Sequence, residues 1–164
     1  MPSREMLKLD DDARQVIETA QAELPVKLSV VANKLGVRVI ASTLPAGISG
    51  ELRPSADGVF VISINRHDSS RRQRFTVAHE LAHFLLHRDH IGNGIKDDVL
   101  YRSGLSDSRE AEANRLAADI LMPTSLVKRQ LIAHGGIATE DVVATLADEF
   151  GVSDAAMQIR LGME

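Results

Sequence analysis

The chain has 164 residues, of which 44% are hydrophobic and 26% charged, and its formal net charge at pH 7 is −4. These values are typical of a soluble globular protein and exclude a disordered or fibrous class, and the length predicts a single domain over residues 1–164. The chain has no cysteine, which excludes disulfides, thiolate metal ligands and cysteine nucleophiles, so any metal ion must be held by nitrogen and oxygen atoms.

The first part of the chain predicts two helices and then strands. Apolar residues recur at helical spacing from Asp10 to Glu23, and a second short helix from Ser29 to Leu35 ends before Gly36. Three segments rich in branched residues predict a small antiparallel sheet: 37–40, 48–53 and 59–64. The last of these is a candidate edge strand for holding a peptide in extended form, although its apolar run is more typical of a core strand.

The second part of the chain is predominantly helical. Ser70 and Gln73 form a capping-box pattern before a helix over about Arg71–His87, and the glycine-rich segment Ile91–Gly104 is predicted to be a loop. A long helix over Ser106–Met122 ends at a proline. Further helices are predicted at 124–133, 139–150 and 153–161, within a helical C-terminal segment over 124–164. Strands enclosed by helices indicate an α+β domain.

The motif His79-Glu80-Leu81-Ala82-His83 predicts a metal centre on the helix 71–87. Four residues advance an α-helix by about 400°, so His79 and His83 lie on one face, about 6 Å apart along the axis. Two imidazoles at this spacing can bind one zinc ion, and Glu80 lies where a carboxylate can accept the proton of an attacking water molecule. Because the flanking residues are uncharged, these ionisable groups need a buried partner.

A catalytic zinc ion needs a third protein ligand. His87 is about 12 Å along the axis from His79 on a straight helix, too far to share the ion. The next helix offers Glu110 and Glu112, and spacing alone does not choose between them. Glu110 shares a helical face with small residues and with Asn114, which favours Glu110 as the ligand and Asn114 as an outer partner. Glu112 is rotated by about 200° and is predicted to be solvated.

Two blocks of sequence resemble the ImmA/IrrE family of metallo-endopeptidases, a gluzincin-like group. They are His79 to His87, which contains the motif, and Glu110 to Pro123, which ends in Ala-Ala-Asp-Ile-Leu-Met-Pro. The resemblance covers about 28–123 and implies that Glu110 is the third ligand of a single Zn²⁺ ion. It also implies limited proteolysis of a helix-turn-helix repressor, often encoded beside the peptidase in mobile elements or stress regulons.

Within this interpretation, Glu80 is the general base, and a further group would stabilise the oxyanion of the tetrahedral intermediate. The loop before the second block offers Tyr101, Arg102 and His90. Tyr101, the only tyrosine, is the candidate; it could equally be a half-buried aromatic residue that anchors the loop.

The remaining features concern partners and location. Arg71, Arg72 and Arg74 form the strongest basic cluster, but the net negative charge and the lack of aromatic residues favour a solvated face over direct binding of nucleic acid. The polar amino terminus and the absence of a long apolar run predict a cytoplasmic protein without a membrane segment. The alternative function is a zinc-containing regulatory module that binds a repressor or an antitoxin without cleaving it.

Overall fold

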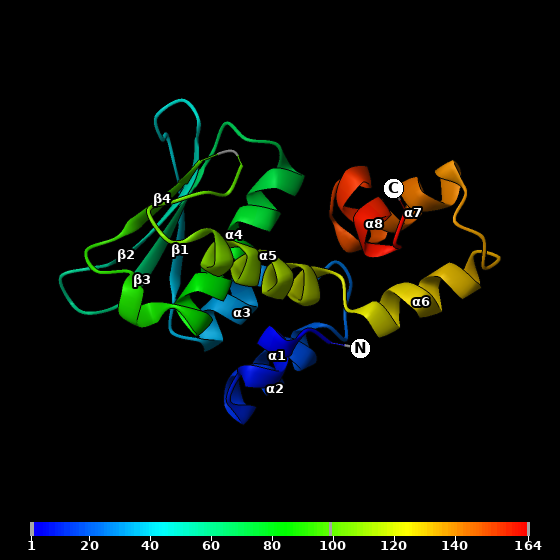
Figure 1. The fold of residues 1–164 in the computed structure, drawn as a ribbon, viewed down its shortest axis with the longest axis horizontal. Helices are drawn as coiled ribbons and strands as arrows, with labels where there is room; N and C mark the ends of the chain where they lie inside the picture. The colour runs from blue at the N-terminus through cyan, green and yellow to red at the C-terminus, as the bar shows by residue number, and fades with distance from the viewer. Residues whose placement is uncertain (1, 99, 164) are drawn as a thin grey trace.

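The computed structural model describes residues 2–98 and 100–163 and shows an α+β fold, as the sequence predicted. Within these residues there are eight α-helices and a four-stranded sheet. Figure 1 shows the sheet on one side of the molecule, with α4 (Ser70–Leu86) and α5 (Asp107–Leu121) beside it. None of the helices in the described part of the chain combines the length and apolar character needed to cross a bilayer.

The sheet is mixed, whereas the sequence predicted three antiparallel strands. Its strands are β1 (Arg38–Ser42), β2 (Ile48–Pro54), β3 (Phe60–Asn65) and β4 (Ile95–Asp98), in the order β1-β3-β2-β4. Strand β3 pairs in parallel with β1 and antiparallel with β2, and β2 pairs antiparallel with β4. The prediction of an antiparallel sheet was wrong for β1 and β3 because hydrophobic patterning does not determine which strands become neighbours.

The structure changes the interpretation of two segments, 59–64 and 91–104. β3 is buried between two neighbours, which confirms the core strand and removes it as an edge for peptide binding. The segment 91–104, predicted to be a loop, contains β4, which forms one edge of the sheet next to β2. Short strands with charged residues, such as Ile95-Lys96-Asp97-Asp98, give a weak signal in sequence.

The helices at the amino terminus pack against the far end of α5. A helix that the sequence analysis did not predict, α1 (Arg4–Lys8), precedes α2 (Asp11–Ala20) and α3 (Leu28–Lys34). The amide of Ser3 donates to the carboxylate of Asp119, 2.6 Å away, and the side chain of Gln21 donates to the carbonyls of Asp119 and Ile120.

The C-terminal helices are fastened to the first turns of α4. They are α6 (Thr124–Ala133), α7 (Glu140–Phe150) and α8 (Asp154–Arg160), and Figure 1 shows α6 extending away from the body of the molecule before α7 and α8 return toward it. Arg71 donates to the carbonyl of Val152 and to Asp148, and Arg74 donates to the carbonyls of Gly151 and Val26. For these two arginines the prediction of a solvated face was therefore wrong.

An ion pair between a buried carboxylate and a partly exposed arginine joins α1 to the outer face of α5. The carboxylate of Glu5 is buried and accepts hydrogen bonds from Arg115, at 2.8 and 3.1 Å, and from Arg4. These hydrogen bonds, chiefly those from Arg115, lower the pKa of Glu5 to about 2. A carboxylate with a lowered pKa stabilises the fold above its unfolded-state pKa, and that contribution is lost as the pH falls through the folded-state value.

We predict that Glu5→Gln lowers the free energy of unfolding at pH 7 by about 1–2 kcal/mol, a modest value because the Arg115 side chain is 43% exposed. The difference from the wild type should shrink as the pH falls from about 4.5 toward about 2. Urea unfolding across this range measures it, with the exposed Glu18→Gln on α2 as control. A difference independent of pH would contradict the assignment.

Candidate metal centre

Helix α4 carries the motif between the sheet and α5. The hydroxyl of Ser69 accepts a hydrogen bond from the amide of Arg72 and caps the helix, one residue before the predicted cap. Every residue from Thr76 to Phe84 is buried because α4 packs against β2 and β3 on one side and against α5 on the other. The ionisable groups of the motif are therefore removed from water, as the sequence predicted.

Four side chains converge where α4, α5 and β4 meet. His79, His83, Asp97 and Glu110 are buried and each offers one ligand atom, all within 4.8 Å of one another. The two Nε2 atoms of the histidines are 3.1 Å apart, Nε2 of His79 is 3.3 Å from Oδ1 of Asp97, and Nε2 of His83 is 2.5 Å from Oε1 of Glu110. Bonds of 2.0–2.1 Å in a tetrahedral zinc site place neighbouring ligand atoms about 3.3 Å apart. The cluster could therefore hold such an ion.

The orientation of His79 is set by α5. Its Nδ1–H donates to Oδ1 of Asn114 at 2.8 Å, which turns Nε2 toward the cluster. Asn114 thus contacts one of the candidate ligands from outside the cluster, as the sequence predicted. Burial disfavours the charged form of His79, but hydrogen bonds with Asp97 and Glu110 outweigh it and raise its pKa to about 9.

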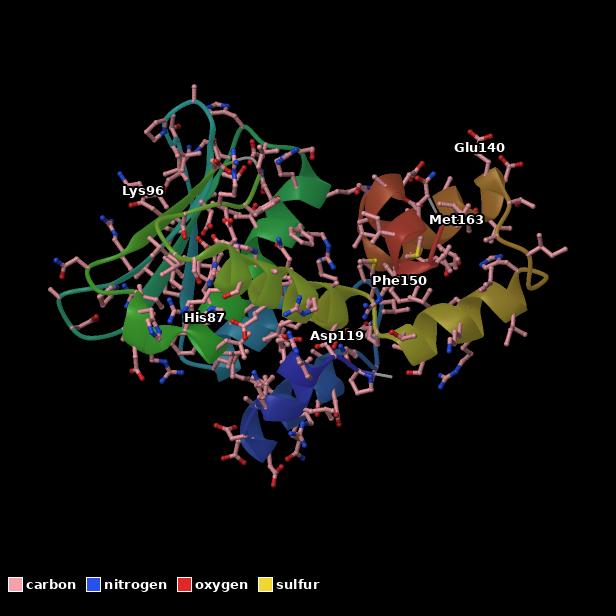
Figure 2. The ribbon with its side chains drawn as sticks, viewed as in Figure 1. His87, Lys96, Asp119, Glu140, Phe150 and Met163 are labelled. Atoms are coloured by element: carbon pink, nitrogen blue, oxygen red, sulfur yellow. The ribbon has the colours of Figure 1, made fainter. Side chains whose placement is uncertain are left out.

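The orientation of His83 is set by a relay that the sequence analysis missed. Its Nδ1–H donates to Nδ1 of His87 at 2.9 Å, and Nε2–H of His87 donates to Oε1 of Glu112 at 3.1 Å. Burial lowers the pKa of His87, which favours the neutral ring that this relay requires. His87 lies outside the four-residue cluster, and Figure 2 shows it at the C-terminal end of α4. Glu112 is a partner in the relay, so the prediction of a merely solvated carboxylate was wrong.

Glu110 is held by the segment that precedes α5. Its Oε2 accepts hydrogen bonds from the amide and the hydroxyl of Ser103, both at 3.0 Å, while Oε1 faces the two histidines. Burial opposes the ionisation of Glu110, but the hydrogen bonds from His79 and His83 outweigh it and hold its pKa well below the ordinary value. The carboxylate is therefore charged and aimed at the cluster.

Glu80 is fully buried beside the cluster without a fixed partner. Within residues 2–98 and 100–163, neither of its carboxylate oxygens has a hydrogen-bond partner. Burial raises its pKa well above the ordinary value, and the nearby carboxylate of Asp97 raises it further. Gly50 of β2 faces this side chain, where a Cβ atom would lie 2.5 Å from the methyl group of Thr76 and 3.4 Å from Oε2 of Glu80. The absence of a side chain at Gly50 therefore leaves room for Thr76, one turn before Glu80 on α4.

Asp97 is the member of the cluster that the sequence analysis missed. Residues alternate along β4, so Ile95 and Asp97 are buried while Lys96 is exposed. An aspartate on the buried face of a strand was the available signal, but it requires the strand itself to be recognised.

The structure brings the ring of Tyr101 to the cluster but turns its hydroxyl elsewhere. The ring centroid is 5.1 Å from that of His79 and 4.9 Å from that of Phe75. The hydroxyl is 3.1 Å from that of Thr76 and donates to the carbonyl of Arg72. With a φ of 56°, Tyr101 adopts the left-handed conformation that few non-glycine residues tolerate. The two alternatives pair elsewhere: Arg102 with Asp98, and His90 with Arg109.

A family model matches most of the chain. Residues 32–162 match the model of the IrrE N-terminal-like domain, Peptidase_M78. The chain belongs to the ImmA/IrrE metallopeptidase family. The match extends from α3 through the C-terminal helices, well beyond Pro123, where the resemblance visible in the sequence ends.

Other comparisons add information on the fold. The structure is similar to a Mycobacterium tuberculosis transcriptional regulator, with a TM-score of 0.56 and 16% sequence identity over 98% of this chain and 49% of that one. At this identity the likeness concerns the fold alone, and the chain spans about half the length of that protein. No curated protein matches the chain significantly.

We predict that His87→Ala weakens zinc binding about 10- to 100-fold, because His83 loses the partner that orients its ring. Competition with a chromophoric chelator measures the affinity. His90→Ala is the matched control, since His90 is an exposed histidine paired with Arg109 outside the cluster. Equal affinity of the His87 variant and the wild type would show that the relay does not support the site.

We also predict that zinc uptake at pH 7.5 releases at least one proton per ion. The raised pKa of His79, about 9, keeps the ion-free ring protonated at this pH, and a metal ion must displace that proton to reach Nε2. Isothermal titration in two buffers of different ionisation enthalpy counts the protons. The number should fall as the starting pH approaches 9, and an enthalpy independent of the buffer would refute the prediction.

Proposed function

We propose that this chain is a cytoplasmic zinc-dependent endopeptidase that performs limited proteolysis of a helix-turn-helix repressor, in control of a mobile element or a stress response. The observation that carries the proposal is the buried, unpartnered carboxylate of Glu80 beside a cluster of two histidines and two carboxylates. A binding site has no use for an additional buried carboxylate, whereas hydrolysis requires a base. Membership of a metallopeptidase family supports the reaction type.

In this proposal His79, His83 and Glu110 would hold one Zn²⁺ ion. When bound, the ion would supply Lewis-acid chemistry, lowering the pKa of water and polarising a peptide carbonyl. Asn114, His87 and Ser103 hold the three side chains in place.

A divalent cation held beside Glu80 would offset the rise in its pKa and favour the ionised form, in which Glu80 accepts the proton of the attacking water molecule and then delivers it to the leaving amine. Its burial against Gly50 and Thr76 keeps bulk water from its carboxylate, which strengthens its interaction with nearby charges.

The edge of β4 opposite β2 is the candidate surface for the backbone of the substrate, up to Asp98, whose amide and carbonyl bond to Arg102 and Tyr101. Among the described strands, β4 pairs with β2 alone, and it carries Asp97 at the cluster. A peptide that adds to this edge in extended form would pass beside the cluster. This role moves from the strand 59–64, which the structure shows to be internal.

A zinc-containing module that binds a repressor or an antitoxin without cleavage is the second candidate. Asp97 favours it, because a cluster of four protein ligands is typical of structural zinc sites, whereas catalytic sites keep one position open. The two candidates differ in their need for Glu80, which hydrolysis requires and binding does not.

We predict that Glu80→Gln retains zinc but lowers the rate of cleavage by about 10²- to 10⁴-fold, because the amide cannot accept a proton. The measurement is mass spectrometry of fragments after co-expression with the helix-turn-helix protein encoded nearest to this chain, together with metal analysis. Glu140→Gln is the matched control, since Figure 2 shows Glu140 in the C-terminal helices, far from α4. If the wild type and Glu80→Gln leave that partner equally intact, proteolysis of it is refuted and the binding module is favoured.

A further inference from the structure

Asp97 differs from the other members of the cluster in how it is held. His79 is fixed by Asn114, His83 by His87 and Glu110 by two hydrogen bonds from Ser103, so each has a partner that points it at the centre. Asp97 is fully buried, and in the described part of the chain its Oδ2 has no hydrogen-bond partner. Three side chains are therefore held by hydrogen bonds from outside the cluster, whereas the neighbour of Asp97 on that side is the carboxyl group of Glu80, which disfavours a second charge beside it.

The backbone that carries Asp97 is held by the sheet along one side and by the turn after it, where Asp98 bonds to Tyr101 and Arg102. β4 has four residues and contacts the sheet along one side only, next to β2. Asp97 pairs with Gly50 while its neighbour Asp98 pairs with Ile48, so Ser49 is an extra residue in β2 and the ladder is irregular at Asp97. The helices that carry the histidines and Glu110, by contrast, pack against each other within the core.

The charge of Asp97 and its distance from His79 nevertheless fit a metal ligand. Its Oδ1 is 3.3 Å from Nε2 of His79, about the spacing of neighbouring ligands in a tetrahedral zinc site. The carboxylates of Asp97 and Glu110 together balance the charge of a divalent ion. A buried carboxylate with an unpartnered oxygen is costly unless it gains such a cation.

We propose that Asp97 is a displaceable fourth ligand that keeps the metal centre closed, and that β4 must move Asp97 away from the ion before the site can hydrolyse a peptide. With Asp97 in place, four protein side chains complete the tetrahedral shell and the position that catalytic sites leave open is filled. The other three ligands keep the ion when Asp97 leaves, because their partners lie on α4, on α5 and in the segment before α5. The four-ligand shell itself does not depend on the proposed peptidase function. Its consequence, a peptidase that is inactive until Asp97 leaves, rests on that function.

The test compares the wild type with Asp97→Ala and Asp97→Asn in the full chain. Lys96→Ala is the matched control, because Lys96 lies on the same strand and is exposed, on the opposite face from the buried Asp97; Figure 2 labels it at the sheet. Circular dichroism identifies the folded variants, and Asp97→Asn, which preserves the side-chain volume, replaces Asp97→Ala if the latter does not fold.

Two readouts report on the ligand itself. The visible spectrum of the cobalt(II)-substituted protein, titrated with acetohydroxamate, shows whether an outside ligand reaches the ion; both Asp97 variants should bind it at least tenfold more tightly than the wild type and Lys96→Ala. Zinc affinity, measured by chelator competition, should fall about 10- to 100-fold in the Asp97 variants, as for other supports of a metal site. Equal hydroxamate binding by the wild type and the Asp97 variants, or unchanged zinc affinity, would overturn the proposal.

Cleavage of the helix-turn-helix partner separates this proposal from the proposed function. Faster cleavage by the Asp97 variants, abolished by an added Glu80→Gln, supports both. If the variants open the ion to acetohydroxamate but neither they nor the wild type cleave the partner, the fourth ligand stands and proteolysis of that partner falls. If the wild type cleaves in a Glu80-dependent manner and hydroxamate binds all forms equally, proteolysis stands and the closed state falls.

Discussion

The structure depends on the close packing of α4 against α5, which buries charged groups that must compensate one another. His79, Glu80 and His83 have no exposed surface on α4, and Glu110 is 5% exposed on α5. Isolated charges in such a place would be strongly unfavourable. Small residues permit the approach, since Ala78 and Ala82 on one helix and Ala113 and Ala117 on the other are fully buried. The same approach brings the carboxylate of Glu110 within hydrogen-bond distance of His83 and compensates part of the cost.

The rest of the chain supports this pair of helices at the start of α4 and at the end of α5, away from the cluster. At the start of α4, Arg71 and Arg74 reach the carbonyls between α7 and α8. At the end of α5, Arg160 of α8 donates to Asp119 at 2.5 Å. The N-terminal helices contact α5 through Ser3 and Glu5. Because the C-terminal helices bind both α4 and α5, they fix the relation between the helices that carry the two histidines and Glu110.

The part of the site that could be predicted from the sequence is the part that follows from helix periodicity. His79 and His83 share a face of α4, and Glu110 and Asn114 share a face of α5, because residues four apart lie one above the other. The same arithmetic kept His87 out of the cluster. It could not show that His87 supports His83 from behind, since that role depends on Glu112 of another helix. The α+β class followed from local patterns, whereas strand order and the parallel pairing of β1 and β3 depend on long-range contacts that a single sequence does not encode visibly.

Asp97 could not be identified from the sequence because its position, too, depends on long-range strand pairing. Its strand is short and charged, so its position depends on pairing with β2 and on nothing in its own pattern. Strand β2 packs on α4, where Gly50 faces Thr76 and Glu80, and Gly50 is also the residue opposite Asp97. One position without a side chain thus leaves room for Thr76 beside the base and lies opposite the carboxylate of the cluster. A larger residue at Gly50 would press on Thr76 beside Glu80. Because Asp97 lies close enough to Glu80 to raise its pKa, any movement of β4 along β2 changes what lies beside Glu80.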